Sequence, residues 1–99
     1  MIRIALVIKS FKDALTEAAF NGEVRKGFPA DLIKVARRKL GYLHAAAVLD
    51  DLRAPPANRL EALKGDRRGQ HSIRVNDQFR ICFTWTAEGP KDVEFVDYH

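Results

Sequence analysis

The spacing of apolar residues changes at one loop, and this change limits the folds open to the chain. From residue 11 to about residue 48, apolar side chains recur mainly every three or four positions, the period of an amphipathic helix. After residue 58 they alternate with polar ones, the period of a strand. Between them lies DDLRAPP at residues 50–56, where two prolines and no periodicity predict a loop. Helices followed by strands predict an α+β fold.

The first half is expected to hold a short strand and two helices. Residues 2–8 are β-rich and predict the strand. Ser10 is a candidate N-cap for a helix from Phe11 to about Phe20, which Asn21-Gly22 would end. A longer helix should start near Pro29 and run to about Val48. Its basic run at residues 37–39 is typical of a solvated helix face.

The second half predicts an antiparallel sheet. Strands are expected at residues 59–63, 70–75, 79–86 and 93–98. In residues 79–86 the apolar positions would share one face, while Arg80, Cys82 and Thr84 share the other. We therefore expect a single domain over residues 1–99, with two helices packed on one face of a small antiparallel β-sheet. The side chains on its open face would decide the function.

Charge is concentrated in one segment. Lysine and arginine outnumber the acids 17 to 13, giving a net charge of +4 and a pI near 9.5, which suits a polyanionic partner. Five bases and two acids bring residues 64–80 to +3, so most of the net charge lies there. The bases are Lys64, Arg67, Arg68, Arg74 and Arg80. An RNA-binding sheet face and a hairpin with ordinary surface arginines both fit this pattern.

Several kinds of site find no support in the sequence. A single cysteine, Cys82, allows no intrachain disulfide, which fits a reducing cytoplasm, and its apolar neighbours predict a buried thiol. The apolar run at residues 4–8 is too short for a membrane span or an export signal. The three histidines lack metal-ligand spacing, and no glycine-rich phosphate loop is present. We expect a cytoplasmic protein without metal, cofactor or membrane contact.

The chain ends with Asp97-Tyr98-His99. Histidine titrates near neutral pH and can act as a general acid or base. A frayed tail is the common alternative, because most chain ends are poorly ordered. The residues alone leave both readings open.

Three motifs in order resemble the HigB-type toxins of the RelE-like superfamily, also called plasmid-maintenance killer proteins. They are IKSF at residues 8–11, RLEALKGDRRGQHSIRVNDQFRI at residues 59–81 and DYH at residues 97–99. The resemblance covers residues 8–99 and implies a compact RelE-like fold. It also implies a type II toxin that cleaves translated mRNA at the ribosome. The implied partners are mRNA, the ribosome and an inhibitory HigA-type helix-turn-helix antitoxin, through which alone the toxin would reach operator DNA.

The resemblance assigns roles that suit metal-free RNA cleavage. In this reaction a base takes the proton of the 2′-hydroxyl, and an acid protonates the leaving oxygen. Cations stabilise the negative charge of the phosphorane. His99 is the leading acid–base candidate, Tyr98 would stack on a base or place the phosphate, and Asp97 would orient the site. The cations would come from Arg80, Arg67 and Lys64. Arg68, Arg74 and His71 are candidates for RNA binding.

The chain departs from the family pattern at two places. Glu61 stands where well-known members carry a histidine, and residues 1–7 precede the usual opening motif. A carboxylate can accept a proton but has no cationic form, so Glu61 favours an alternative: a non-catalytic RNA or ribosome binder that inhibits translation by occupancy. A structural or regulatory protein that binds another protein, with incidental charge, is the second alternative.

Overall fold

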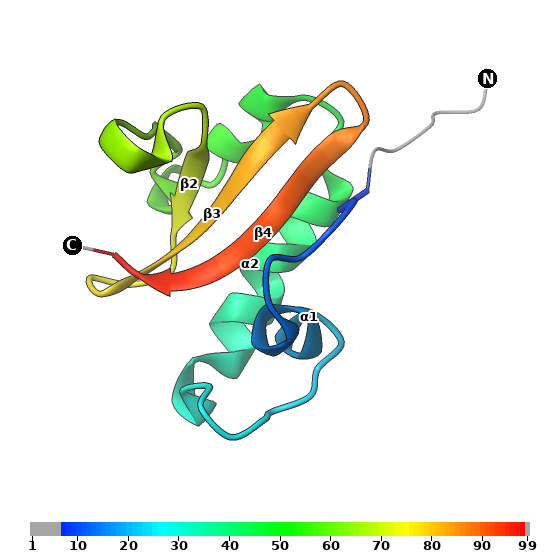
Figure 1. Ribbon diagram of the computed structural model, residues 1–99, viewed down its shortest axis with the longest axis vertical. Coiled ribbons are helices and arrows are strands. Elements are labelled where there is room, and N and C mark those ends of the chain that lie inside the picture. The colour runs from blue at the N-terminus through cyan, green and yellow to red at the C-terminus, as the bar shows by residue number, and fades with distance from the viewer. Residues whose placement is uncertain (1–6, 99) are drawn as a thin grey trace.

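The computed structural model describes residues 7–98, and Figure 1 shows them as helices and an antiparallel sheet. In chain order the elements are α1 (Ala14–Phe20), η1 (Ala30–Leu32), α2 (Ile33–Ala45), η2 (Leu49–Arg53), η3 (Pro56–Asn58), β1 (Glu61–Ala62), η4 (Gly65–Arg67), β2 (His71–Arg74), β3 (Phe79–Thr86) and β4 (Gly89–Asp97), where η marks 3₁₀ helices. Two α-helices and an antiparallel sheet confirm the predicted α+β class.

The sheet has the order β1-β2-β3-β4, with every neighbouring pair antiparallel. β3 has the predicted bounds, whereas β1 is shorter than expected and β4 begins at Gly89 instead of Val93. Pro90 is tolerated in β4 because this strand lies at the edge of the sheet. A register shift beside Asp92, whose φ is 52°, lets the pairing with β3 continue.

Most of the strand predicted at residues 2–8 lies outside the described residues. The segment that follows it runs parallel to β4, as Figure 1 shows. Lys9 N donates to Pro90 O at 2.8 Å, and Lys12 N donates to Val93 O at 2.9 Å. This part of the β4 edge is therefore covered by the chain's own backbone.

The prediction that Ser10 caps the first helix was wrong. Asp13 is the N-cap, and its carboxylate accepts a hydrogen bond from Thr16 N at 2.7 Å. The helix starts late because the backbone of Ser10 is occupied by β4: Val93 N donates to Ser10 O at 3.0 Å. The predicted stop is confirmed, since Asn21 is the C-cap and Gly22 follows with a φ of 82°.

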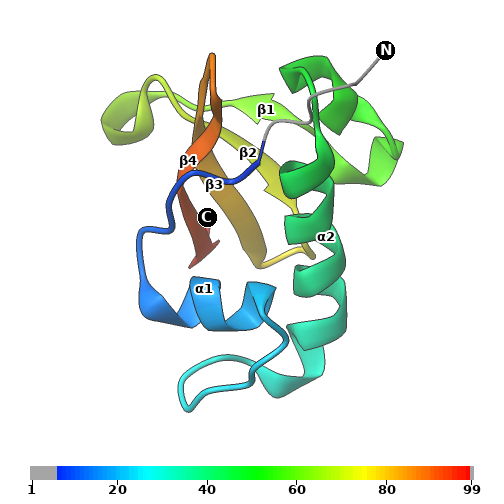
Figure 2. The ribbon, with the colours of Figure 1, turned by 90° about the vertical axis from the view of Figure 1, so that its right-hand side faces the viewer.

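The core lies between the sheet and the two α-helices, with α2 on one side of the sheet in Figure 2. On α2, Ala36, Leu40 and Leu43 are fully buried, as their spacing predicts. Alternate residues of the strands face them. The buried apolar residues of the sheet on this side are Ile73, Val75, Ile81, Phe83 and Val93.

The basic run on α2 is not uniformly solvated, which corrects the prediction. Arg37 and Arg38 are exposed, but Lys39 is buried and donates to Asn58 Oδ1 at 2.5 Å. Asn58 in turn donates its side-chain amide to Leu52 O at 3.1 Å and Ala54 O at 3.3 Å. These bonds fasten the segment predicted as a loop, which forms η2 and η3, to α2.

None of the helices in residues 7–98 has the length and apolar character that would carry it across a membrane.

Candidate active site

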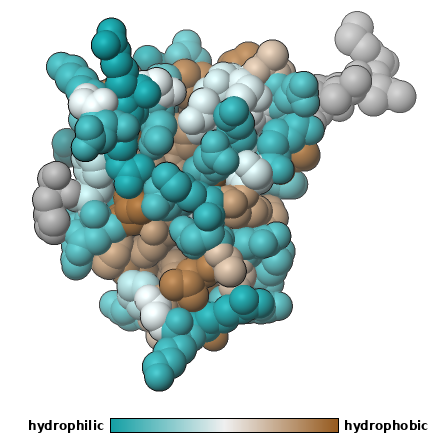
Figure 3. Space-filling model, in the orientation of Figure 1, coloured by the Kyte–Doolittle hydropathy of each residue, from teal (hydrophilic) through white to brown (hydrophobic). Residues whose placement is uncertain are grey.

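The sheet face turned away from α2 carries a row of polar side chains. Pairing aligns Glu61 with Ser72, Ser72 with Cys82 and Cys82 with Glu94, so these four residues cross the sheet on one face. The neighbouring row joins Arg74, Arg80 and Val96. We call this surface the open face. Figure 3 views the molecule from the side of Figure 1, and polar side chains gather over its upper half.

Arg80 is held rigidly on the open face. Its Nε donates to Ser72 Oγ at 2.6 Å, and its Nη2 donates to Arg59 O at 2.7 Å. Glu61 Oε2 lies 3.4 Å from the same Nη2, and the Arg80 side chain is only 12% exposed. Arg59 presents its carbonyl from a left-handed backbone with a φ of 46°. The guanidinium is thus fixed from β2, from the segment before β1 and from β1 itself.

Arg67 approaches the open face from η4. Its Nη1 donates to Gln70 Oε1 and Glu94 Oε1, both at 3.1 Å. Burial lowers the pKa of Arg67, but the hydrogen bond and charge of Glu94, together with the Cys82 and Tyr98 side chains, outweigh it and raise the pKa overall. Arg67 is therefore a permanent cation next to Glu94 and within electrostatic reach of Tyr98.

The C-terminal end of β4 is bound to the turn between β2 and β3. Tyr98 N donates to Gln78 O at 2.9 Å, and Gln78 Nε2 donates to Asp97 Oδ2 at 2.9 Å. Alternation from Glu94 and Val96 places Tyr98 on the side of the open face, in keeping with its effect on Arg67. His99 lies outside the described residues.

We call Arg80, Arg67, Ser72, Glu94 and Tyr98 the cluster. The other basic residues predicted for the site lie at its margin. Lys64 and Arg68 flank η4, and both are exposed. Arg74 lies beside Arg80 in the register but forms an ion pair with Asp77 in the same turn. Glu61 is 58% exposed and pairs with Arg80. Three of the predicted cations, Arg67, Arg74 and Arg80, are therefore already paired with carboxylates.

His71 does not join them. It shares the helix-facing side of β2 with Ile73, and its ring stacks on Phe83 with centroids 6.3 Å apart. Its Nδ1 is buried and has no hydrogen-bond partner within residues 7–98. The sheet thus separates this histidine from the arginines. The alternation of side chains along β2 is sufficient to predict this separation, because His71 and Arg74 are three positions apart.

Sequence reasoning missed two residues of the cluster, Glu94 and Ser72. Glu94 is two positions before Val96 in the predicted last strand, so alternation places both side chains on the same face of the sheet. Its contact with Arg67 could not be predicted, because it depends on the position of η4 relative to the sheet. Ser72 is fully buried and receives the Nε–H of Arg80. Cys82 lies among these side chains, and burial raises the pKa of its thiol, as its apolar neighbours suggested.

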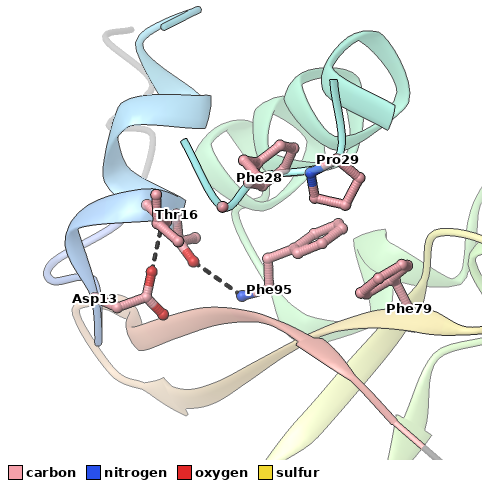
Figure 4. Close-up of a pocket in the computed structure, with 8 residues that line it drawn as sticks. Asp13, Thr16, Phe28, Pro29, Phe79 and Phe95 are labelled. Atoms are coloured by element: carbon pink, nitrogen blue, oxygen red, sulfur yellow. Dashed lines mark hydrogen bonds between the residues drawn. The ribbon is translucent and has the colours of Figure 1, made fainter. Parts of the chain in front are cut away.

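A separate cavity of about 190 Å³ opens between α1, the turn before η1 and the end of the sheet (Figure 4). It is lined by Asp13, Leu15, Thr16, Gly27, Phe28, Pro29, Phe79 and Phe95. Phe79 and Phe95 alternate with Arg80 and Glu94 along their strands, so the cavity lies on the opposite side of the sheet from the arginines. Nowhere in residues 7–98 do three histidine, cysteine, aspartate or glutamate side chains group as metal ligands would.

Comparison with known proteins places the chain in a family. The family model for the RelE-like toxin HigB of type II toxin–antitoxin systems matches residues 9–99. Toxin HigB-1 of Vibrio cholerae serotype O1 is 42% identical over 90 residues, covering 90% of this chain and 94% of that protein. Endoribonuclease HigB of Proteus vulgaris is 31% identical over 93 residues, covering 94% of this chain and all of that protein. The chain therefore belongs to the HigB family of RelE-like toxins of type II toxin–antitoxin systems.

Proposed function

We propose that this toxin is an endoribonuclease that cleaves messenger RNA on the ribosome by acid–base chemistry without a metal ion. The observation that carries the proposal is the fixed placement of the Arg80 guanidinium on the open face, the face on which Arg67 contacts Glu94. The similarity to an endoribonuclease of Proteus vulgaris supports the same reaction.

In this reaction the RNA 2′-hydroxyl attacks the adjacent phosphorus and the 5′-oxygen leaves. His99 is proposed as the acid–base group, with Asp97 and Tyr98 orienting it and the scissile phosphate. Arg80 and Arg67 would hold the phosphorane charge, because guanidinium groups donate paired N–H bonds to phosphate oxygens. Pre-organised donors of this kind contribute about 10²–10³ in rate.

The exposed bases extend this site toward the RNA backbone. Lys64 and Arg68 flank Arg67 on η4 and can reach phosphates on either side of the scissile one. Arg74 would bind RNA after its ion pair with Asp77 is replaced by an ion pair with a phosphate group. Glu61, beside Arg80, is the second candidate base. His71 has no part in the proposal, because its ring stacks on Phe83 on the helix-facing side.

Membership in a type II family implies an antitoxin. We propose a HigA-type protein with a helix-turn-helix domain as this partner. It would supply the contacts to operator DNA, and the toxin would reach DNA only within the complex. The site of action would be the cytoplasm, where ribosomes are engaged on mRNA.

The test is inducible expression in bacteria, followed by primer extension on abundant mRNAs. Wild type is compared with His99→Ala and with a variant lacking the last two residues, with a strain that co-expresses the antitoxin as control. Cuts within coding regions that both variants lose would establish the nuclease and its C-terminal chemistry. Cuts that survive in both variants would keep the nuclease but move the acid–base role toward Glu61.

A second candidate function is occupancy of the ribosome without cleavage. The pairing of Glu61 with Arg80 and of Glu94 with Arg67 favours it, because both carboxylates offset cationic charge that a phosphorane would need. This function predicts growth arrest with intact mRNA in the same experiment. It also predicts that His99→Ala arrests growth as strongly as wild type.

A further inference from the structure

The turn between β2 and β3 contacts the C-terminal end of the chain twice. Gln78 O accepts the backbone N–H of Tyr98 at 2.9 Å. The side-chain amide of the same residue donates to Asp97 Oδ2, also at 2.9 Å. The register of β3 and β4 ends with Phe79 opposite Asp97, so the Gln78 carbonyl extends the pairing by one residue past the strand.

The turn has its own internal brace. Asn76 Oδ1 accepts two backbone N–H groups, from Gln78 at 2.9 Å and from Phe79 at 2.7 Å. Asparagine side chains commonly shape turns by bonding to the backbone two residues ahead. On the other side, Asp77 is paired with Arg74. The position of the Gln78 carbonyl therefore depends on the Asn76 side chain.

This brace acts on a part of the chain that is ordinarily loose. The last residues of a domain fray unless something ties them down. Here Tyr98 is the last described residue, and it lies within electrostatic reach of Arg67. Fixing the Tyr98 backbone therefore limits where the Tyr98 side chain can lie relative to Arg67.

We propose that Asn76 and Gln78 are positioning residues. Together they hold the C-terminal segment, Asp97 and Tyr98, in a fixed position relative to Arg67 and Arg80. We call this pair of residues the clasp. The proposal rests on the proposed function, because the segment it positions is the one to which acid–base chemistry is assigned. Neither residue needs to touch the RNA for this role. Asn76 sets the turn, and Gln78 transmits its position to Asp97 and Tyr98.

The first test compares Asn76→Ala with Asn76→Asp, and measures hydrogen exchange at the Tyr98 amide by NMR together with the cleavage rate. Alanine removes the acceptor of both N–H groups, and we expect exchange at Tyr98 to rise about fivefold to thirtyfold, the range for losing one to two hydrogen bonds. Aspartate also accepts both N–H groups, so it should restore protection and cleavage. Asn21→Ala, which removes an exposed asparagine at the end of α1, is the matched control and should leave Tyr98 unchanged.

The second test addresses the side-chain contact by hydrogen exchange alone. Gln78→Glu sets a carboxylate against Asp97 and should loosen Tyr98 by like-charge repulsion. The double variant Gln78→Glu/Asp97→Asn reverses donor and acceptor, and it should restore protection to within about twofold of wild type, since it regains one hydrogen bond.

The outcomes separate this clasp from the proposed function. Unchanged Tyr98 exchange in Asn76→Ala, or equal loosening in Asn76→Ala and Asn76→Asp, would overturn the clasp. Faster exchange in Asn76→Ala, restored in Asn76→Asp, would support it even if the wild-type protein cut no RNA. In that case only the proposed nuclease would fail. If Asn76→Ala loosened Tyr98 and left cleavage at the wild-type rate, the positioning role would be refuted.

Discussion

Arg67 and Glu94 are 27 residues apart in the sequence, yet Arg67 Nη1 lies 3.1 Å from Glu94 Oε1 on the open face of the sheet. Lys12 Nζ lies 4.0 Å from the same carboxylate oxygen. A carboxylate thus lies beside Arg67, one of the cations proposed to hold the phosphorane charge. Glu94 orients Arg67, and it also offsets part of the positive charge that RNA would meet.

We expect Glu94→Gln to bind a short single-stranded RNA about twofold to fivefold more tightly at low salt, because it keeps an acceptor for Arg67 and removes a negative charge. Fluorescence anisotropy over a series of salt concentrations measures this. Glu88→Gln, which changes the net charge equally at an exposed turn, is the matched control. Equal gains in both variants would mean that net charge alone is responsible.

Arg80→Lys tests whether the fixed guanidinium matters beyond its charge. Lysine keeps the charge but cannot donate to Ser72 Oγ and Arg59 O in the same planar arrangement. We expect cleavage to fall about 10²-fold, in line with the loss of a pre-organised donor. Primer extension with purified ribosomes and toxin gives the rate. Arg68→Lys, at an exposed position next to η4, should lose less than about threefold if its phosphate contact depends on charge alone.

The Cys82 thiol should resist alkylation in the native protein. It is 1% exposed, and its burial outweighs the opposing charge of Arg67 and raises its pKa above the ordinary 9.0. Reaction with a thiol reagent at neutral pH should proceed only as fast as the protein opens, and should complete in urea. Rapid labelling of the folded protein would contradict the buried position.

The raised pKa of Cys82 also predicts a dependence of stability on pH. A group whose folded pKa is raised binds its proton more tightly when folded, so its contribution is complete below pH 9.0 and declines as pH rises through the folded value. Urea unfolding of wild type and Cys82→Ala at about pH 8 and pH 10.5 isolates this effect. The wild type should lose more stability than the variant across that interval.

Lys39 predicts the opposite trend. Burial, then the charges of Arg38 and Arg74, lowers its pKa below the ordinary 10.5, so the folded state carries the cost of a buried charge at neutral pH. That cost is relieved as pH rises from the folded pKa toward 10.5. Relative to Lys39→Met, the wild type should therefore gain stability over this window in urea unfolding. A constant difference between the two proteins would show that the Lys39 charge is not desolvated.

Local pattern was sufficient for the elements of regular structure. The alternation in residues 79–86 gave β3 its bounds and separated Ile81 and Phe83 from Arg80. The three- and four-residue spacing of Ala36, Leu40 and Leu43 gave the buried face of α2. Such patterns succeed because the side-chain period follows directly from backbone geometry. The start of α1 differs from the prediction because the Ser10 carbonyl accepts a hydrogen bond from Val93 N of distant β4, and this bond competes with helix formation.

The sequence by itself determined the class of fold, the family and the set of basic residues from which the candidate site is drawn. Only the tertiary structure decided which of them share a face of the sheet and which side chains they contact. It buried Lys39 on Asn58, turned His71 toward Phe83, and brought Glu94 to Arg67. It also joined Gln78 to Tyr98 at the end of the sheet. These contacts link residues far apart in the chain, and their geometry follows from how the sheet, α2 and the 3₁₀ turns pack, which no local period encodes.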